Sequence, residues 1–195
     1  MNFFRNLFSK QPSNTADSSS DNLDKAKKIF FDYECSHFYM SRDGIDEKYY
    51  KYHISEEQEL EWRKEYIDHW VSQLSVDDMT AVQRLDGACA IEALPNLIYI
   101  ADRGDSFAKL WIANAIWSIT KRDPAIDPDL QKRAIDTAVT LWKSILADKV
   151  WLSECHRKEI SPGSIKALKA STPEEYTVNY ARNKLDEATK EGFAQ

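Results

Sequence analysis

One stretch of the chain, residues 106–121, restricts the possible folds most, because apolar side chains cover almost the whole surface of a helix built from it. Its apolar residues are Phe107, Leu110, Trp111, Ile112, Ala113, Ala115, Ile116, Trp117 and Ile119. A helix that is apolar on every side has no face to turn toward water, so in a soluble protein it lies inside the core. We therefore predict that residues 106–121 form the central and most buried helix.

Glycine and proline are too scarce for a fold that depends on tight turns. The 195 residues include five glycines and six prolines, and neither Asn-Gly nor Gly-Gly occurs. Two-residue β-hairpin loops favour such dipeptides, so an all-β fold is disfavoured. Hydrophobic residues make up 43% of the chain, which is enough for a globular core. The sequence therefore predicts an all-α protein.

Further helices begin at recognisable capping patterns. These starts are Ser55 with Gln58, Asp127 with Pro128, and Thr172 with Pro173 and Glu175. A Ser, Thr or Asp side chain at this position accepts hydrogen bonds from the free amides of the first turn, and proline fits the first helical position. We expect one helix from Ser55, a second over about 128–149, and a last one that ends near Glu191.

Two more helices are predicted from the spacing of apolar residues. One runs from near Asp21 to near Met40, and another runs from Asp77 or Asp78 to about Leu94. Pro95 cannot continue the second helix without a kink, so we expect it to open a new short helix.

Three stretches, at 77–94, 105–119 and 127–145, each begin with Asp and place small alanines ahead of large aliphatic residues. The segment LPNLIYIADRGDSFAKLWIANAIWSI at 94–119 resembles a HEAT-type helical hairpin. This resemblance implies antiparallel helical hairpins stacked in a HEAT-like array. Because alanines also serve the close helix crossings of any bundle, an irregular helical bundle remains the alternative architecture.

The first 22 residues differ from the rest. Phe3, Phe4, Leu7 and Phe8 form one apolar stripe, and a Ser-rich stretch at 11–22 follows. We expect residues 1–22 to form a flexible amphipathic arm with a linker, and residues 23–195 to form a single helical domain. An arm of this kind can lie on a membrane surface, so a membrane-proximal adaptor is one alternative function.

Charge and cysteine content narrow the class of protein further. The net charge is −6, which disfavours binding to nucleic-acid phosphates and favours a basic partner. Three cysteines without a CxxC motif indicate a reducing compartment, so we expect a cytoplasmic protein. No apolar run reaches the length of a membrane-spanning helix.

No motif in the sequence makes a convincing catalytic or cofactor site. A Gly-x-Ser-x-Gly elbow and a glycine-rich phosphate loop are both absent, so no cofactor is predicted. Glu34 and His37 have the Glu-x-x-His spacing of di-iron helical bundles, but the second such motif is missing. A metal-dependent enzyme that uses Glu34 and His37 is therefore kept only as an alternative.

Aromatic and acidic residues concentrate between positions 46 and 61, as they do in protein–protein interfaces. The predicted partner-binding residues are Tyr49, Tyr50, Tyr52, Glu56, Glu57 and Glu61. The other interpretation is that these tyrosines pack over the hydrophobic core. Small acidic helical proteins of this kind resemble the bacterial immunity or antitoxin class. That resemblance implies stoichiometric binding to a basic protein. The sequence specifies neither the identity of this partner nor the oligomeric state of the chain itself.

Overall fold

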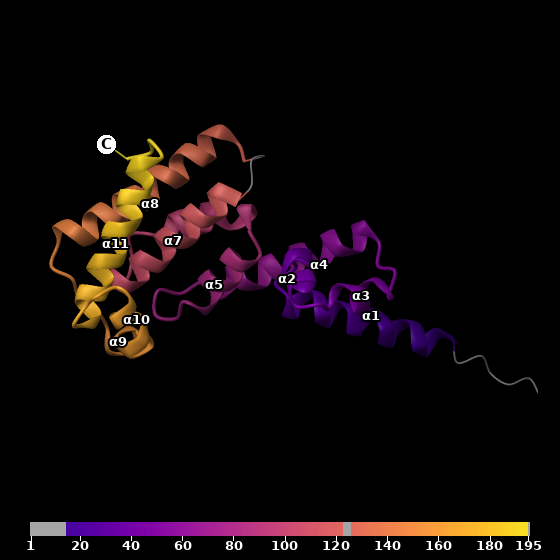
Figure 1. The fold of residues 1–195 in the computed structure, drawn as a ribbon. Coiled ribbons are helices and arrows are strands. Elements are labelled where there is room, and N and C mark those ends of the chain that lie inside the picture. The colour runs from indigo at the N-terminus through magenta and orange to yellow at the C-terminus, as the bar shows by residue number, and fades with distance from the viewer. Residues whose placement is uncertain (1–14, 123–125, 195) are drawn as a thin grey trace, which may run out of the picture. The chain divides into compact units, whose positions relative to one another are not determined.

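The structure is a computed structural model that describes residues 15–122 and 126–194, and every regular element in these ranges is a helix (Figure 1). The prediction of an all-α fold is therefore confirmed. The apolar stripe at Phe3, Phe4, Leu7 and Phe8 lies outside the described residues. None of the described helices is both long enough and apolar enough to cross a bilayer.

Internal contacts divide the chain into two compact units, with the division between Trp62 and Arg63. We call the part that ends at Trp62 unit 1 and the part that begins at Arg63 unit 2. The division falls within helix α4 (Glu56–Ser72), and each unit is described by itself. Whether residues 23–195 act as one folding domain stays a prediction, because units defined by contacts need not fold separately.

Unit 1 contains α1 (Thr15–Asp32), α2 (His37–Arg42), α3 (Asp46–Tyr50) and the start of α4. Helix α1 begins within the stretch at 11–22 that the sequence assigns to a linker. An ion pair between Asp21 and Lys25, one turn apart, supports the helix.

The single helix predicted over 21–40 is wrong, because α1 ends at Asp32 and α2 begins at His37. Cys35 N–H donates to the Phe30 carbonyl (2.8 Å), and Glu34 N–H donates to the Phe31 carbonyl (3.0 Å). This pair of bonds closes the helix end in the manner of a Schellman motif. Glu34 and Cys35 both have a φ of 56°, so the backbone turns there. The helix predicted to carry Glu34 and His37 together does not exist.

The core of unit 1 is built from aromatic rings. Phe30 stacks on Tyr49 with ring centroids 5.9 Å apart and lies 6.2 Å from the ring of Trp62. All three side chains are buried, and so are Ala26 and Met40. The rings thus connect α1, α3 and α4 within this unit.

Unit 2 begins with short elements. They are α5 (Thr80–Gly87), the 3₁₀ helix η1 (Ile91–Ala93) and α6 (Leu94–Ile100). The long helix predicted over 77–94 is therefore broken near Cys89, which has a φ of 48°. Ala90 N–H closes the end of α5 by donating to the Leu85 carbonyl (3.0 Å). Pro95 lies in the first turn of α6, as predicted.

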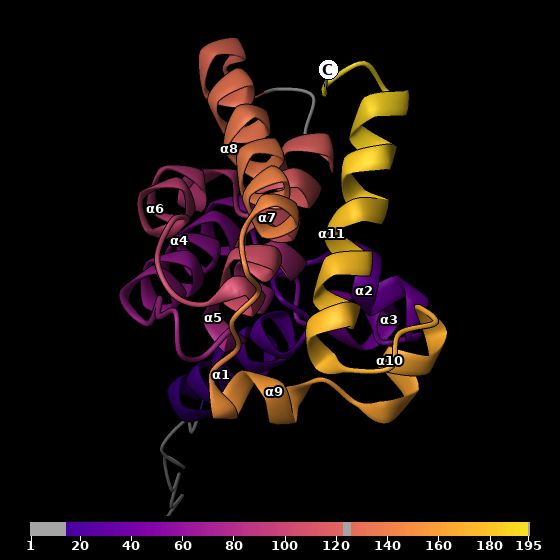
Figure 2. The same cartoon turned by 90° about the vertical axis from the view of Figure 1, so that its left-hand side faces the viewer.

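Three long helices form the body of unit 2 (Figure 2). They are α7 (Ser106–Arg122), α8 (Pro128–Ala147) and α11 (Pro173–Lys190), and each packs against the other two. The predicted burial of α7 is confirmed, since ten of its 17 residues are buried. Helix α7 also contacts α5 and α6. A HEAT-like hairpin arrangement of these helices stays a prediction.

The predicted caps are present. Asp127 accepts hydrogen bonds from the amides of Asp129 (3.1 Å) and Leu130 (3.0 Å) at the start of α8. Thr172 accepts from the Glu175 amide (3.1 Å), and Ser55 accepts from the Gln58 amide (3.2 Å). Between α8 and α11 the chain forms two short helices, α9 (Glu154–Glu159) and α10 (Pro162–Ala167).

The turn before α7 contains a glycine, Gly104, that is required both by its backbone conformation and by the lack of room for a side chain. Gly104 has a φ of +76°, which side chains of L-residues rarely allow. A Cβ atom added there would lie 2.8 Å from Val76 Cβ and 2.9 Å from Ala108 Cβ. The turn can therefore pass this close to its neighbours only because residue 104 is glycine.

Candidate functional site

The residues predicted to bind a partner all lie in unit 1, but they differ in accessibility. Tyr49 is only 1% exposed, so the alternative of a tyrosine that packs in the core holds for this residue. Tyr50 is 55% exposed and Tyr52 is half-buried. The three acidic residues of the prediction, Glu56, Glu57 and Glu61, are exposed on the first turns of α4. Tyr49 therefore cannot make the direct contact that the sequence suggested.

Tyr49 instead joins a hydrogen-bonded cluster around the carboxylate of Glu59. The Tyr49 hydroxyl donates to Glu59 Oε1 (2.7 Å), and His37 Nε2 lies 2.9 Å from Glu59 Oε2. Because an ionised carboxylate only accepts hydrogen bonds, Nε2 of His37 carries the proton in this contact. Burial and the Glu59 carboxylate raise the pKa of Tyr49 far above its usual value, so its hydroxyl stays a donor.

The same histidine positions the exposed tyrosine. The ring of His37 lies nearly parallel to that of Tyr50, with 14° between the planes and 5.9 Å between centroids. His37 also meets Tyr49 edge-on at 5.7 Å. Glu59 thus fixes His37, and His37 supports one face of Tyr50. We call Tyr50, His37 and Glu59 the aromatic–carboxylate platform.

The sequence around the platform is strongly acidic. Positions 43–61 contain seven carboxylates and two lysines. The Glu57 carboxylate accepts hydrogen bonds from its own amide and from the Ser55 side chain, and these bonds lower its pKa. Carboxylates in the first turn of α4 are also stabilised by the helix dipole. The platform therefore lies in a segment whose charge attracts positive groups.

The residues proposed for a metal site are not arranged for one. Glu34 lies in the turn between α1 and α2, whereas His37 begins α2 and already contacts Glu59. Over residues 15–122 and 126–194, no three or more His, Cys, Asp and Glu side chains gather in a way that could hold a metal ion.

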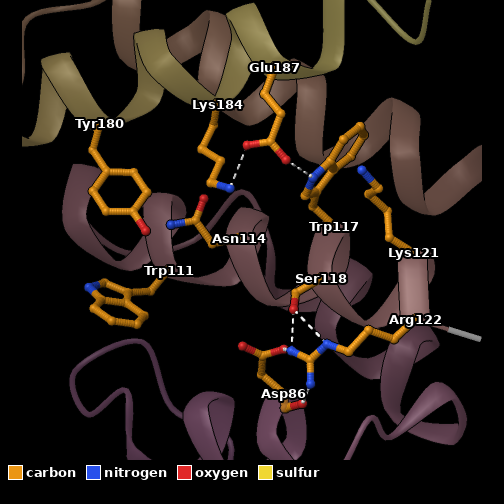
Figure 3. A pocket seen from close by; sticks show the side chains of 10 residues that line it. All are labelled: Asp86, Trp111, Asn114, Trp117, Ser118, Lys121, Arg122, Tyr180, Lys184 and Glu187. Carbon is orange, nitrogen blue, oxygen red and sulfur yellow. Dashed lines mark hydrogen bonds and ion pairs between the residues drawn. The ribbon is translucent and has the colours of Figure 1, made fainter. Parts of the chain in front are cut away.

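A cleft in unit 2 was not predicted from the sequence (Figure 3). We call it the α7–α11 cleft, and its volume is about 320 Å³. Its lining residues are Asp86, Trp111, Asn114, Trp117, Ser118, Lys121, Arg122, Tyr180, Lys184 and Glu187. Asn114, Ser118 and Lys121 follow one another at helical spacing along α7. This narrow polar stripe in an otherwise apolar helix is the sequence signal that could have revealed the cleft.

The carboxylates of the cleft are held by neighbouring donors. Glu187 accepts from Lys184 Nζ (2.8 Å) and from the Trp117 indole (3.3 Å), and these contacts lower its pKa in spite of burial. Asp86 pairs with Arg122. Burial raises the pKa of Asp86, although Arg122 opposes the shift.

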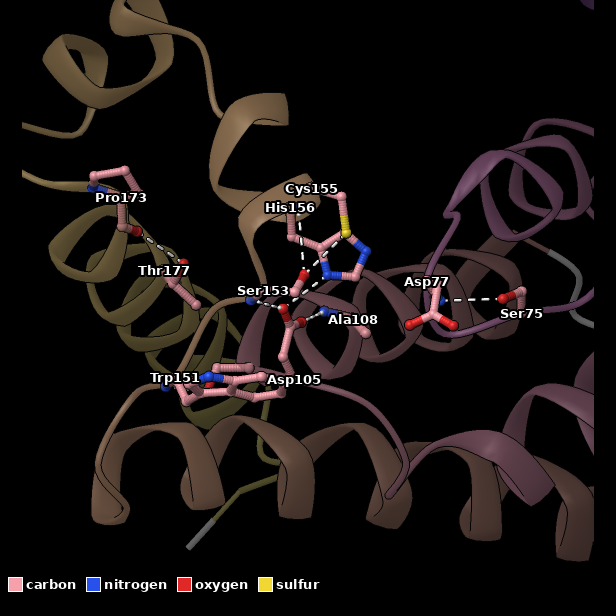
Figure 4. Close-up of polar contacts among 11 residues, drawn as sticks. Ser75, Asp77, Asp105, Ala108, Trp151, Ser153, Cys155, His156, Pro173 and Thr177 are labelled. Carbon is pink, nitrogen blue, oxygen red and sulfur yellow. Dashed lines mark hydrogen bonds and ion pairs between the residues drawn. The ribbon is translucent and has the colours of Figure 1, made fainter.

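A second histidine–carboxylate pair is buried in unit 2 (Figure 4). His156 Nδ1 lies 2.8 Å from Asp105 Oδ2, and both side chains are 1% exposed. Asp105 also accepts from the amides of Ala108 (2.8 Å) and Ser153 (2.6 Å). The carboxylate therefore caps the start of α7 and holds the chain that enters α9. We call this group the Asp105 tie.

The Asp105 tie is built for structure more than for catalysis. Burial alone raises the pKa of Asp105, but the hydrogen bonds from Ala108, Ser153 and His156 outweigh it and hold the pKa below its usual value. Because Asp105 accepts, His156 carries its proton on Nδ1, and Nε2 is buried without a hydrogen-bond partner in the described structure. A side chain that is 1% exposed offers no approach to a substrate.

Comparison with protein-family models, curated proteins and solved structures finds no match for this chain. The fold and the sites therefore define an all-α protein with an aromatic–carboxylate platform, a cleft and a buried tie. The resemblances to HEAT-type and immunity-type proteins stay predictions.

Proposed function

We propose that the chain is a protein-binding module that binds a basic partner protein through unit 1. The observation that carries the proposal is the platform, in which an exposed tyrosine is stacked on a histidine that a carboxylate fixes. The contact residues are Tyr50 and the exposed acids Glu56, Glu57 and Glu61.

Rigidity favours this role for Tyr50. Binding costs free energy for every side chain that becomes ordered, and a side chain already held in place costs less. Tyrosine is also among the residues that most often contribute large shares of binding energy. The stack on His37 therefore prepares Tyr50 to act as an anchor.

The acidic residues have a separate role. Carboxylates around an anchor attract a positively charged partner and raise the association rate, an effect that salt weakens. The stretch with seven carboxylates and two lysines supplies this attraction.

An immunity-type role would follow if the covered surface of the partner were its own functional site. Binding alone would then block that site. A metal-dependent enzyme has less support, because Glu34 and His37 do not share a helix and Glu59 already contacts His37. The membrane-proximal adaptor depends on residues 3–8, which lie outside the described residues.

The proposal can be tested by capturing the partner from a native extract and measuring binding kinetics with variants. Tyr50→Ala is expected to speed dissociation and weaken binding by about 2 kcal/mol, the usual size for a hot-spot residue. The matched control is Tyr99→Ala in unit 2, since Tyr99 is also exposed, at 69%.

Charge reversal tests the acidic part of the surface. Replacing Glu56 and Glu57 with Lys is expected to slow association and to reduce its dependence on salt. Replacing the exposed Asp102 and Asp148 with Lys is the control with the same change in net charge. The assignment of the surface to unit 1 would be wrong if the two double variants had equal effects on association. It would also be wrong if Tyr50→Ala kept full affinity while Tyr99→Ala lost affinity.

A further inference from the structure

The α7–α11 cleft contains more hydrogen-bond donors than its own acceptors can use. Its carboxylates already accept internal bonds, Glu187 from Lys184 and Trp117, and Asp86 from Arg122. Each of these carboxylates is thus already paired with a cation of the cleft, Glu187 with Lys184 and Asp86 with Arg122.

Asn114 shows which donors remain. The indole N–H of Trp142, a buried donor, points at Asn114 Oδ1 at 3.2 Å. Because an indole nitrogen can only donate, the oxygen of the Asn114 amide must face Trp142 and its NH₂ group must face the other way. Within the described part of the chain, nothing accepts a hydrogen bond from that NH₂ group, and Figure 3 shows the side chain on the wall of the cleft.

Other lining groups add donors to the same space. The Lys184 ammonium has three N–H groups, of which one bonds to Glu187. The Tyr180 hydroxyl also lines the cleft and has no hydrogen-bond partner among residues 15–122 and 126–194. The free groups are thus an ammonium, an amide NH₂ and a phenol, which together favour a ligand with negatively charged acceptors.

The walls add a preference for a flat apolar group. Trp111 and Tyr180 are both half-buried, so each presents part of its ring to the cleft. Aromatic rings prefer other rings in stacked or edge-on contact. A volume of about 320 Å³ lies at the small end of the range for ligand pockets.

We propose that the α7–α11 cleft binds a small aromatic carboxylate. The ring of the ligand contacts Trp111 and Tyr180, and its carboxylate accepts hydrogen bonds from Lys184 and Asn114. A carboxylate has one negative charge and two acceptor oxygens, so it can pair with the Lys184 ammonium and also accept a hydrogen bond from the Asn114 amide. The site lies wholly in unit 2 and is independent of the proposed partner surface.

The test uses phenylacetate as the probe and phenylacetamide as its neutral isostere. In ¹H–¹⁵N spectra of the full chain, phenylacetate is expected to shift the Trp111 indole and Asn114 side-chain amide signals in a saturable way. Phenylacetamide should bind at least about tenfold more weakly, because it lacks the charge that Lys184 recognises. Equal binding of the two probes, or no saturable shift of these signals with phenylacetate, overturns the proposal.

Variants of Lys184 separate recognition of charge from folding. Lys184→Met keeps most of the apolar side chain and should raise the dissociation constant for phenylacetate at least about tenfold, whereas Lys184→Arg should keep binding. The control is Lys166→Met, since Lys166 is exposed on α10 and does not line the cleft. Unchanged affinity in a folded Lys184→Met protein, or equal losses in the Met and Arg variants, contradicts the proposed role of the ammonium.

Discussion

Two histidine–carboxylate pairs in this protein have almost the same geometry and very different surroundings. His156 lies 2.8 Å from Asp105 in unit 2, and His37 lies 2.9 Å from Glu59 in unit 1. The first pair is 1% exposed on both sides, whereas His37 is 43% and Glu59 is 20% exposed. The distance between the partners therefore says little about the role of a pair, and burial says much more.

The other partners of each carboxylate explain the difference. Asp105 accepts two backbone amides, from Ala108 and Ser153, so it fixes main chain from two distant parts of the sequence. Glu59 accepts hydrogen bonds from two side chains, those of Tyr49 and His37, and through His37 it orients an exposed ring. One pair holds the fold, and the other arranges a surface.

The largest expected effect is that of removing the buried carboxylate. Asp105→Ala should lower the free energy of unfolding by about 3–5 kcal/mol, because it leaves His156 and two backbone amides without their acceptor. Glu59→Ala should cost about 1–2 kcal/mol, because the pair is partly exposed but the buried Tyr49 hydroxyl also loses its acceptor. Urea denaturation of both variants measures the difference, and similar losses would break the comparison.

Two tryptophans on α7 show a similar contrast, between a buried and a half-buried position. Trp117 is 2% exposed and meets Trp142 edge-on at 5.5 Å, whereas Trp111 is half-buried at the cleft. Trp117→Ala is expected to cost about 3–5 kcal/mol and Trp111→Ala clearly less, because only the first leaves a cavity in the core. Thermal or urea unfolding checks the order of the two variants.

Acid titration sharpens the comparison further. The pKa of Asp105 is lower in the folded protein than in the unfolded chain, so its contribution to stability is complete above the unfolded pKa of about 4. That contribution is lost as the pH falls from about 4 through the folded pKa. Asp105→Asn should therefore flatten the fall in unfolding free energy between pH 5 and pH 2. An identical pH profile for wild type and Asp105→Asn would show that Asp105 does not contribute through its charge.

The smallest expected effect concerns the hydroxyl of Tyr49. Tyr49→Phe keeps the stack on Phe30 and removes only the hydrogen bond to Glu59, so it should cost about 1 kcal/mol of stability. Glu59 then has His37 alone, and the platform should loosen enough to weaken partner binding. A variant with lower stability and undiminished partner affinity would show that the platform does not depend on Tyr49.

Much of the fold could be predicted from the sequence because its signals are local. The apolar surface of residues 106–121 indicated the buried α7, and the Asp127 and Thr172 patterns marked the starts of α8 and α11. The break between α1 and α2 was missed because apolar spacing continues through it. The residues with positive φ there are Glu34 and Cys35, not the glycine or asparagine that usually ends a helix.

The sites were harder to predict because they depend on which neighbours meet in space. Tyr49 and Tyr50 are adjacent and identical in chemistry, yet one is in the core and the other is exposed. Asp105 and His156 are 51 residues apart, and no local pattern connects them. The acidic character of residues 43–61 is visible in the sequence alone. The stack of Tyr50 on His37, which makes Tyr50 rigid, is visible only in the structure.

The glycine before Asp105 also limits how this protein can change over generations. Any single-nucleotide substitution that replaces a glycine codon with another amino acid introduces a Cβ atom, and at residue 104 that atom would meet Val76 and Ala108 at 2.8 and 2.9 Å. The positive φ of +76° penalises the same substitutions a second time. Every single amino-acid substitution of Gly104 is therefore expected to be destabilising. Related proteins that keep the Asp105 tie should also keep glycine at position 104.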